Sequence, residues 1–183
     1  MTAEKILIKR AKQGDTRAFE ALVNHHARYV YTLTNRLLPD SQEAEDLAQE
    51  TFIRAWQNLA KFRGEAQFRT WLYRIATNLC YNRLPNLKRD LSALDPDDSI
   101  VISDKTPAAE QQLIQAEQQA KLSEMINSLP ESYRLLIVLR HVNELSYQEI
   151  SQVTELPLGT VKTGIFRARK MLKERLESSW VNG

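Results

Sequence analysis

Apolar residues recur along most of this chain every three or four positions, which is the spacing that places them on one face of a helix. The first half contains four such segments. We predict helices over 4–12, 16–37, from Ser41 to about Leu59, and from Phe68 to about Leu84. Gly14 breaks the first pair, and Pro85 ends the fourth helix because proline lacks the N–H that a helix interior requires.

The second half begins with a change of pattern. Residues 90–110 are polar and contain two prolines, and the span 90–117 holds seven acidic residues and one basic residue. Such a segment is typical of a linker. Helical periodicity resumes from about Pro107 to Ser128 and again after Pro130. The predicted fold is therefore all-α, with two small helical domains (1–88 and 121–183) joined by an acidic flexible linker at 89–120.

Residues 145–176 have the pattern of a helix, a tight turn and a second helix. Ser146 and Glu149 are spaced as a capping box, and Leu145 and Ile150 are spaced as a hydrophobic staple around the same helix start. Pro157 suits the first turn of the second helix, where its missing N–H would have no partner. We predict a helix-turn-helix.

The second of these helices divides into an apolar face and a basic face. Between Gly159 and Arg175 there are six basic residues and one acidic residue. The apolar face comprises Val161, Ile165, Ala168, Leu172 and Leu176, and the opposite arc comprises Lys162, Thr163, Phe166, Arg167, Lys170 and Lys173. Helix-turn-helix proteins place such a helix in the major groove of DNA. A solvated basic helix in an ordinary bundle is the alternative, and the agreement of cap, turn and faces favours DNA binding.

Composition narrows the class of protein. The 183 residues include only five glycines, and helix-forming residues dominate. The formal net charge is only +2, so the informative feature is how the charges are segregated. The single cysteine excludes an internal disulfide framework and fits a reducing cytosol. We see no signal-peptide pattern and no apolar run of about 18 residues, so we expect a cytoplasmic protein without membrane insertion.

An acidic surface is predicted on the third helix. The span 40–50 has five acidic residues and no basic residue, and Asp46, Gln49, Glu50 and Ile53 share the face opposite the core. A carboxylate stripe that surrounds an aliphatic residue favours docking of a basic partner. A plain solvated face remains an alternative. Asp46 and Glu50 could also form a metal or acid–base pair, but no histidine or third ligand lies nearby in sequence.

A basic, aromatic stripe is predicted on the fourth helix. The span 61–90 has seven basic and two acidic residues. The stripe comprises Trp71, Arg74, Thr77, Asn78, Tyr81 and Asn82. Rings on which unpaired bases can stack, next to amide and guanidinium donors, favour single-strand recognition. The alternative is that the two aromatic residues are amphipathic rim residues of an ordinary helix.

Enzymatic chemistry is not indicated. The adjacent His25 and His26 point about 100° apart on a helix, and we expect them not to share a metal ion. The three histidines and one cysteine form no evident catalytic or metal cluster, so we predict neither an enzyme nor a cofactor.

Four segments together resemble the extracytoplasmic-function (ECF, group IV) sigma factors of bacterial RNA polymerase. They are DLAQETFIRAW at 46–56, FRGEAQFRTWLYRIATNL at 62–79, LPESYR at 129–134 and LSYQEISQVTELPLGTVKTGIFRARKML at 145–172. The resemblance covers nearly the whole chain, in the family's order. It implies a factor that binds core RNA polymerase and reads the −35 and −10 promoter elements while nucleating DNA melting.

The resemblance also implies where each partner binds. The first domain would bind the clamp helices of the polymerase β′ subunit and the −10 element, with a flipped base held at loop 62–67, and the second would bind the β flap and the −35 element. The core-binding residues would be Asp46, Gln49, Glu50 and Ile53. The −10 readers would be Phe62, Arg63, Trp71, Arg74 and Asn78. The −35 readers would be Thr160, Lys162, Thr163, Phe166, Arg167 and Lys170.

Two further expectations follow from the resemblance. An anti-sigma protein is expected as an inhibitor. Gly164 departs from the family pattern, in which arginine is usual, so we expect the loss of one cationic contact and a helix cost of about 1 kcal/mol relative to alanine. A helix-turn-helix regulator that works without polymerase is the alternative function; it would bind operator DNA tightly alone.

Overall fold

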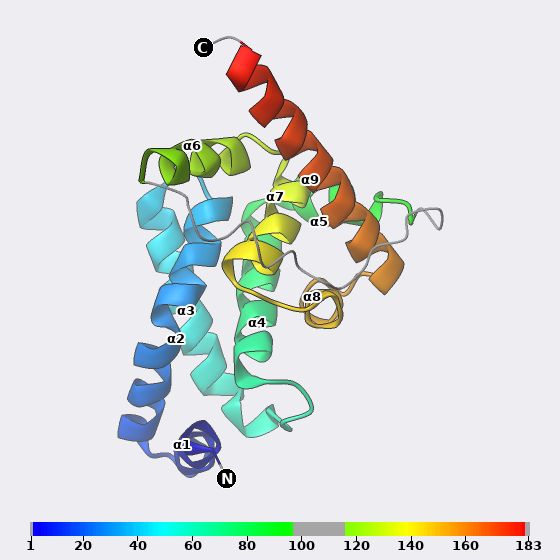
Figure 1. The fold of residues 1–183 in the computed structure, drawn as a ribbon. Helices are drawn as coiled ribbons and strands as arrows, with labels where there is room; N and C mark the ends of the chain where they lie inside the picture. Colours follow the sequence, from blue (N-terminus) through cyan, green and yellow to red (C-terminus); the bar gives the residue numbers. More distant parts are fainter. Residues whose placement is uncertain (1, 97–115, 182–183) are drawn as a thin grey trace. The chain divides into compact units, whose positions relative to one another are not determined.

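The computed structural model describes residues 2–96 and 116–181, and for 116–121 and 178–181 it describes the backbone only. In these ranges every regular element is a helix, which confirms the all-α prediction (Figure 1). No helix in the described ranges is both long and apolar enough to cross a membrane. The predicted linker lies mostly in 97–115, outside the described residues.

Two compact units make up the chain. The first consists of Met1–Pro85 with Gln152–Thr154, and the second consists of Asn86–Ser151 with Glu155–Gly183. The first unit contains α1 (Ala3–Lys12), α2 (Thr16–Leu37), α3 (Ser41–Asn58), the 3-10 turn η1 (Leu59–Lys61) and α4 (Phe68–Arg83). Helices α2, α3 and α4 pack on one another, and α1 packs against α2 and η1 (Figure 1).

Local signals explain where these helices begin and end. The Asp15 carboxylate accepts a hydrogen bond from the Ala18 N–H at 3.1 Å, and the Asp40 carboxylate accepts one from the Glu43 N–H at 2.8 Å. Each caps an N–H that has no partner within its helix. Gly14, at a φ of 91°, makes the left-handed turn between α1 and α2.

The core of the first unit is formed by the predicted apolar faces. Leu22, Leu33, Leu47 and Leu72 are at most 1% exposed. Trp56, which the apolar spacing of α3 predicts on the core side, is instead 36% exposed, and its ring packs on Phe19 with 4.9 Å between centroids. The large ring therefore covers the edge of the contact between α2 and α3 without being fully enclosed.

The second unit contains α6 (Ala116–Asn127), α7 (Glu131–Ile137), the π-turn η2 (Val138–Val142) and α9 (Leu158–Val181). It also contains α5 (Pro85–Ser92) except Pro85, and α8 (Tyr147–Thr154) except its last three residues. Helix α5 was not predicted. Pro85 ends α4 as expected, but it also begins α5, because proline suits the first position of a helix. Leu87 and Leu91, four residues apart, form its buried side.

The helix-turn-helix is confirmed in detail. The Ser146 hydroxyl accepts from the Glu149 N–H at 3.2 Å, and the Glu149 carboxylate accepts from the Ser146 N–H at 2.9 Å, which is the predicted capping box. Glu155 takes the left-handed conformation at the turn. On α9, Val161, Ile165 and Ala168 are fully buried as predicted. Burial of the predicted apolar face decreases after that point, since Leu172 is half-buried and Leu176 is 36% exposed.

Candidate nucleic-acid and partner surfaces

The first candidate surface is the acidic face of α3, formed by Asp46, Gln49, Glu50 and Ile53. Asp46 and Gln49 are exposed, and Ile53 is 56% exposed, a large value for an aliphatic residue. Beside Ile53, the side chains of Phe19, Phe52 and Trp56 line a shallow apolar hollow. The acidic face therefore combines negative charge with exposed apolar area, as a protein-docking surface does.

Ion pairs hold part of this charge in place. Arg54 donates to the Glu50 carboxylate at 2.9 and 2.7 Å, and Arg83 of α4 lies 3.0 Å from Glu43 and 3.9 Å from Glu50. Because the Glu50 carboxylate is paired with guanidinium groups, it is poorly placed to ligate a metal with Asp46. Across 2–96 and 116–181, neither Asp46 nor Glu50 belongs to a group of three metal-ligating side chains.

An aromatic cluster lies where η1 leads into α4. The ring centroids of Phe62, Phe68 and Trp71 are 5.1 to 5.6 Å apart. Phe62 is only 7% exposed, so its ring supports the half-buried Trp71 and offers little free surface to a base. Gly64, at a φ of 76°, turns the loop between Phe62 and Phe68, and Arg63 projects from this loop into solvent.

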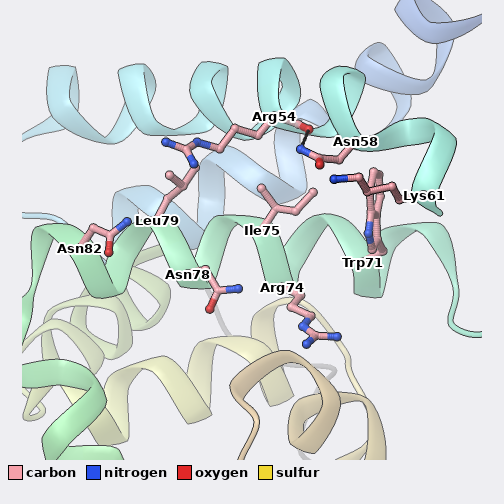
Figure 2. Close-up of a pocket in the computed structure, with 9 residues that line it drawn as sticks. All are labelled: Arg54, Asn58, Lys61, Trp71, Arg74, Ile75, Asn78, Leu79 and Asn82. Atoms are coloured by element: carbon pink, nitrogen blue, oxygen red, sulfur yellow. Dashed lines mark hydrogen bonds between the residues drawn. The ribbon is translucent and has the colours of Figure 1, made fainter.

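A groove between α3 and α4 adjoins this cluster. Figure 2 shows Ile75 and Leu79 pointing from α4 toward α3, whereas Arg74 and Asn78 point to the other side of α4. The groove therefore has an apolar floor, with Arg54, Asn58 and Lys61 on the α3 side, and Arg74 and Asn78 border it from the outer side of α4. Its lining residues are Arg54, Asn58, Lys61, Trp71, Arg74, Ile75, Asn78, Leu79 and Asn82.

The groove joins predicted and unpredicted residues. Trp71, Arg74 and Asn78 were predicted as −10 readers and line it together, whereas Phe62 and Arg63 do not. Arg54 and Lys61 were missed, although they stand seven residues apart, two helical turns, on the same side of the chain segment. Three cations around an apolar floor suit a polyanion whose bases stack while its phosphates are neutralised.

The third candidate surface lies on α9. Phe166 is 44% exposed, Lys170 is exposed, and Lys162 and Arg167 are partly exposed. The Lys162 ammonium lies 5.9 Å from the ring centroid of the buried Tyr147, which also stacks with Arg140 at 4.6 Å. Thr160 and Thr163 are buried, at 4% and 2% exposed, so their predicted contact with DNA is not displayed in this conformation.

Comparison with known proteins decides the family. The chain matches the models for Sigma-70 region 2 over residues 22–90 and Sigma-70 region 4 over residues 119–172. It is 38% identical over 180 residues to the RNA polymerase sigma-H factor of Pseudomonas aeruginosa, covering 93% of this chain and 92% of that one. It is 39% identical to the ECF RNA polymerase sigma factor SigW of Bacillus subtilis, covering 92% and 94%. The chain belongs to the ECF sigma factors.

Solved structures agree with this assignment. CnrH, in complex with the cytosolic domain of CnrY, superposes with a TM-score of 0.70 at 25% identity, covering 97% of this chain and 99% of that one. The sigma factor RpoE of Bartonella quintana, in complex with the anti-sigma factor NepR, shares the fold, with a TM-score of 0.65 at 23% identity over 87% of this chain and 96% of that one.

Membership of this family shows the function of the chain. This sigma factor binds core RNA polymerase and directs promoter-specific initiation of transcription, and its family consists of transcription-initiation factors. The alternative, a regulator that works without polymerase, is not favoured, because both sigma-70 regions are present.

The role expected for Gly164 in this sigma factor needs a correction. A Cβ built on Gly164 would stand 2.4 Å from Cδ1 of Leu136 on α7, so the position faces the core of its unit. The expectation that this glycine removes a cationic contact at the DNA surface is therefore wrong. The glycine instead permits α9 to approach α7 closely.

The histidines also differ from expectation. His26 is buried, and its Nε2 lies 2.8 Å from the Glu4 carboxylate, which links α1 to α2. Burial lowers the pKa of His26 below its ordinary value, although Glu4 opposes this shift. One ligand atom from each of Glu4, His25 and His26 lies within 4.8 Å of the others, so an angle of about 100° between adjacent histidines does not by itself prevent them from approaching one ion. The Glu4–His26 hydrogen bond brings two of these side chains together, and the His25 ring lies edge-on to the His26 ring with 4.8 Å between centroids.

Proposed function

We propose that the acidic face of α3 is the surface through which this sigma factor binds the β′ clamp helices of core polymerase. Exposed Ile53, 56% accessible, supplies apolar contact, while Asp46, Gln49 and Glu50 supply acceptors and negative charge. The Arg54–Glu50 pair orients one of these carboxylates before the partner arrives, and Arg83 pairs with Glu43 on the same helix.

The groove between α3 and α4, with the aromatic cluster, would receive the unpaired −10 strand. Trp71 offers a ring face, and Arg74 and Asn78 offer donors, joined by Arg54 and Lys61. We assign Phe62 the role of supporting Trp71, because little of its own ring is accessible. Arg63, on the exposed loop, would contact a phosphate or the flipped base. Binding of the open form pulls the duplex equilibrium toward melting.

The exposed side of α9 would read the −35 element. Lys162, Phe166, Arg167 and Lys170 are accessible to bases and phosphates. Thr160 and Thr163 remain predicted readers of the −35 element, and their buried side chains would have to become more exposed when DNA binds. The same unit would bind the β flap, while the acidic linker connects the two domains, for which we retain the proposed limits of 1–88, 89–120 and 121–183.

We further propose that an anti-sigma protein inhibits the factor, since the structural relatives CnrH and RpoE are seen with such partners. The factor would carry no catalytic chemistry of its own; the polymerase supplies it. It would act in the cytoplasm, where core polymerase is found.

The observation that carries this proposal is the division of α3 between two surfaces. Its acidic face presents Asp46 and Ile53, and its neighbouring side presents Arg54 and Asn58 to the cationic groove. One rigid helix can therefore dock on a basic partner while holding a nucleic-acid strand, which is what loading polymerase onto an opening promoter requires.

Reconstitution with core polymerase tests the proposal. Asp46→Lys and Ile53→Glu should each abolish co-elution with core enzyme and promoter-dependent transcription, with helical content retained by circular dichroism. Glu45→Lys is a matched control on the same helix, because Glu45 is exposed but adjacent to the acidic face. Normal holoenzyme assembly by both Asp46→Lys and Ile53→Glu would remove the docking assignment.

A further inference from the structure

Lys12, the last residue of α1, reaches a residue fifty positions later in the chain. Its Nζ donates a hydrogen bond to the backbone carbonyl of Phe62. The same ammonium lies 5.8 Å from the centroid of the Phe62 ring. A single cation therefore holds both the backbone and the ring of the residue that begins the 62–67 loop.

Phe62 is a position where such an anchor has a clear effect. It caps the C-terminal end of η1, where its N–H bonds to the Leu59 carbonyl at 3.1 Å. Carbonyls at a helix end lack intrahelical N–H partners and carry partial negative charge, so a lysine ammonium stabilises them. Lys12 therefore adds a second constraint, beside the packing of the Phe62 ring on Phe68 and Trp71, on the direction in which the loop leaves η1.

Helix α1, which ends at Lys12, is held against α2 at both of its ends. Helix α1 packs on α2 through the buried Ala11, and its first turn is tied to α2 by the Glu4–His26 contact at 2.8 Å. Near its end, Arg10 pairs with the α2 cap Asp15 at 2.7 Å. A helix fastened at both ends can hold a loop in place rather than follow its movements.

The anchored residue supports the aromatic cluster. The Phe62 ring lies 5.1 Å from Trp71 and 5.6 Å from Phe68, and Trp71 borders the groove. A shift of Phe62 would withdraw the support under the Trp71 ring and change the shape of the loop beside it. Preorganised aromatic surfaces bind with less loss of side-chain freedom than mobile ones.

We propose that Lys12 is a positioning residue for promoter melting: it fixes Phe62, and through Phe62 it holds loop 62–67 and Trp71 ready to receive an extruded base. This inference rests on the proposed −10 role of the groove. It gives α1 a function in strand capture although α1 does not line the groove.

A direct phosphate contact by Lys12 is the competing explanation, and salt dependence separates the two. Removing a phosphate contact reduces the slope of log affinity against log salt by about one unit. Removing a positioning contact lowers the affinity at every salt concentration and leaves the slope unchanged, because no counterion release is lost.

The experiment uses holoenzyme assembled with wild-type factor, Lys12→Met, Lys12→Arg or Lys9→Met, the last being an exposed α1 lysine as matched control. Binding of a single-stranded −10 oligonucleotide is measured by anisotropy at several salt concentrations, and extrusion is followed with 2-aminopurine replacing the captured base. We expect Lys12→Met to lose about fivefold in affinity, to lose most of the extrusion signal and to keep the wild-type slope. Lys12→Arg should restore both signals, and Lys9→Met should match wild type.

Three outcomes would overturn the inference: wild-type extrusion by Lys12→Met, a slope reduced by about one unit, or equal losses for Lys12→Met and Lys9→Met. Core binding and melting temperature are measured on every variant, so that loss of folding is recognised. If Lys12→Met is unstable, the test passes to Lys12→Arg. Failure of Lys12→Arg to restore extrusion, at wild-type stability, then also counts against the inference. Failure of the −10 proposal itself gives a different result, because wild-type holoenzyme would then show no binding of the −10 oligonucleotide.

Discussion

Arg54 directs both its Nε and its Nη2 at one carboxylate oxygen of Glu50, at distances of 2.9 and 2.7 Å. The two residues belong to different surfaces, since Glu50 lies on the acidic face of α3 and Arg54 lines the groove between α3 and α4. An exposed pair four residues apart contributes only about 0.3–0.5 kcal/mol. Either partner can therefore exchange this contact for polymerase or for DNA at little cost.

Arg54→Gln tests whether the groove holds nucleic acid. The change removes one of three cations from the groove, so holoenzyme should bind the single-stranded −10 oligonucleotide about five- to tenfold more weakly. Core binding should stay close to wild type, because the exposed Arg54–Glu50 pair contributes little and Arg83 remains 3.9 Å from Glu50. Arg28→Gln, which removes an exposed arginine of α2, is the control for charge alone. Equal weakening by both variants would mean that net charge, not the groove, sets the affinity.

Gly164→Ala tests the close approach of α9 to α7. Alanine favours a helix by about 1 kcal/mol over glycine, but its Cβ would meet Leu136 Cδ1 at 2.4 Å. Overpacking of this kind costs about 1–3 kcal/mol, so we expect net destabilisation in urea unfolding. Leu136→Ala should lessen the penalty when the two changes are combined. A simple gain in stability from Gly164→Ala would show that the helices separate freely.

Lys162→Ala and Arg167→Ala test the −35 surface on α9. Both side chains are partly exposed on the basic arc, so each variant should reduce transcription from promoters with an intact −35 element while core binding is unchanged. Templates with a scrambled −35 element provide the comparison, and there the variants should differ little from wild type. If scrambling has no effect on the wild-type factor, α9 does not read that element.

His141 makes the stability of the second unit depend on pH. Burial and the charges of Arg169 and Arg140 lower the pKa of His141 to about 4, and its Nε2 accepts a hydrogen bond from Arg169 at 3.1 Å. The unfolded chain, with a pKa near 6.5, takes up the proton first. Stability should therefore be full above about pH 6.5 and decline as the pH falls toward 4.

His141→Gln provides the measurement for this dependence. A glutamine oxygen can still accept from Arg169, but it does not titrate, so the variant should lose less stability between pH 6.5 and 4 than wild type. The buried His26 acts in the same direction, and only the difference between variant and wild type is informative. His25→Gln removes an exposed histidine as a control. Parallel pH profiles for wild type and His141→Gln would contradict the assignment.

The sequence by itself determined the helical framework and the helix-turn-helix. The caps at Asp15, Asp40 and Ser146 and the stops at Gly14 and Pro85 involve partners within about one helical turn. Side-chain order along the chain is enough to predict such contacts. The acidic face of α3 was equally predictable, because a helix of known phase fixes which residues share a side.

Only the tertiary structure decided what each of these helices faces. In the folded chain Phe62 is buried beside Trp71, and Arg54 and Lys61 line the same groove as Arg74. Gly164 faces Leu136, and Lys12 contacts Phe62. Each of these relationships joins residues from different elements of the chain. Their geometry follows from how whole faces pack together, and periodicity within one helix carries no information about the neighbour that will cover it.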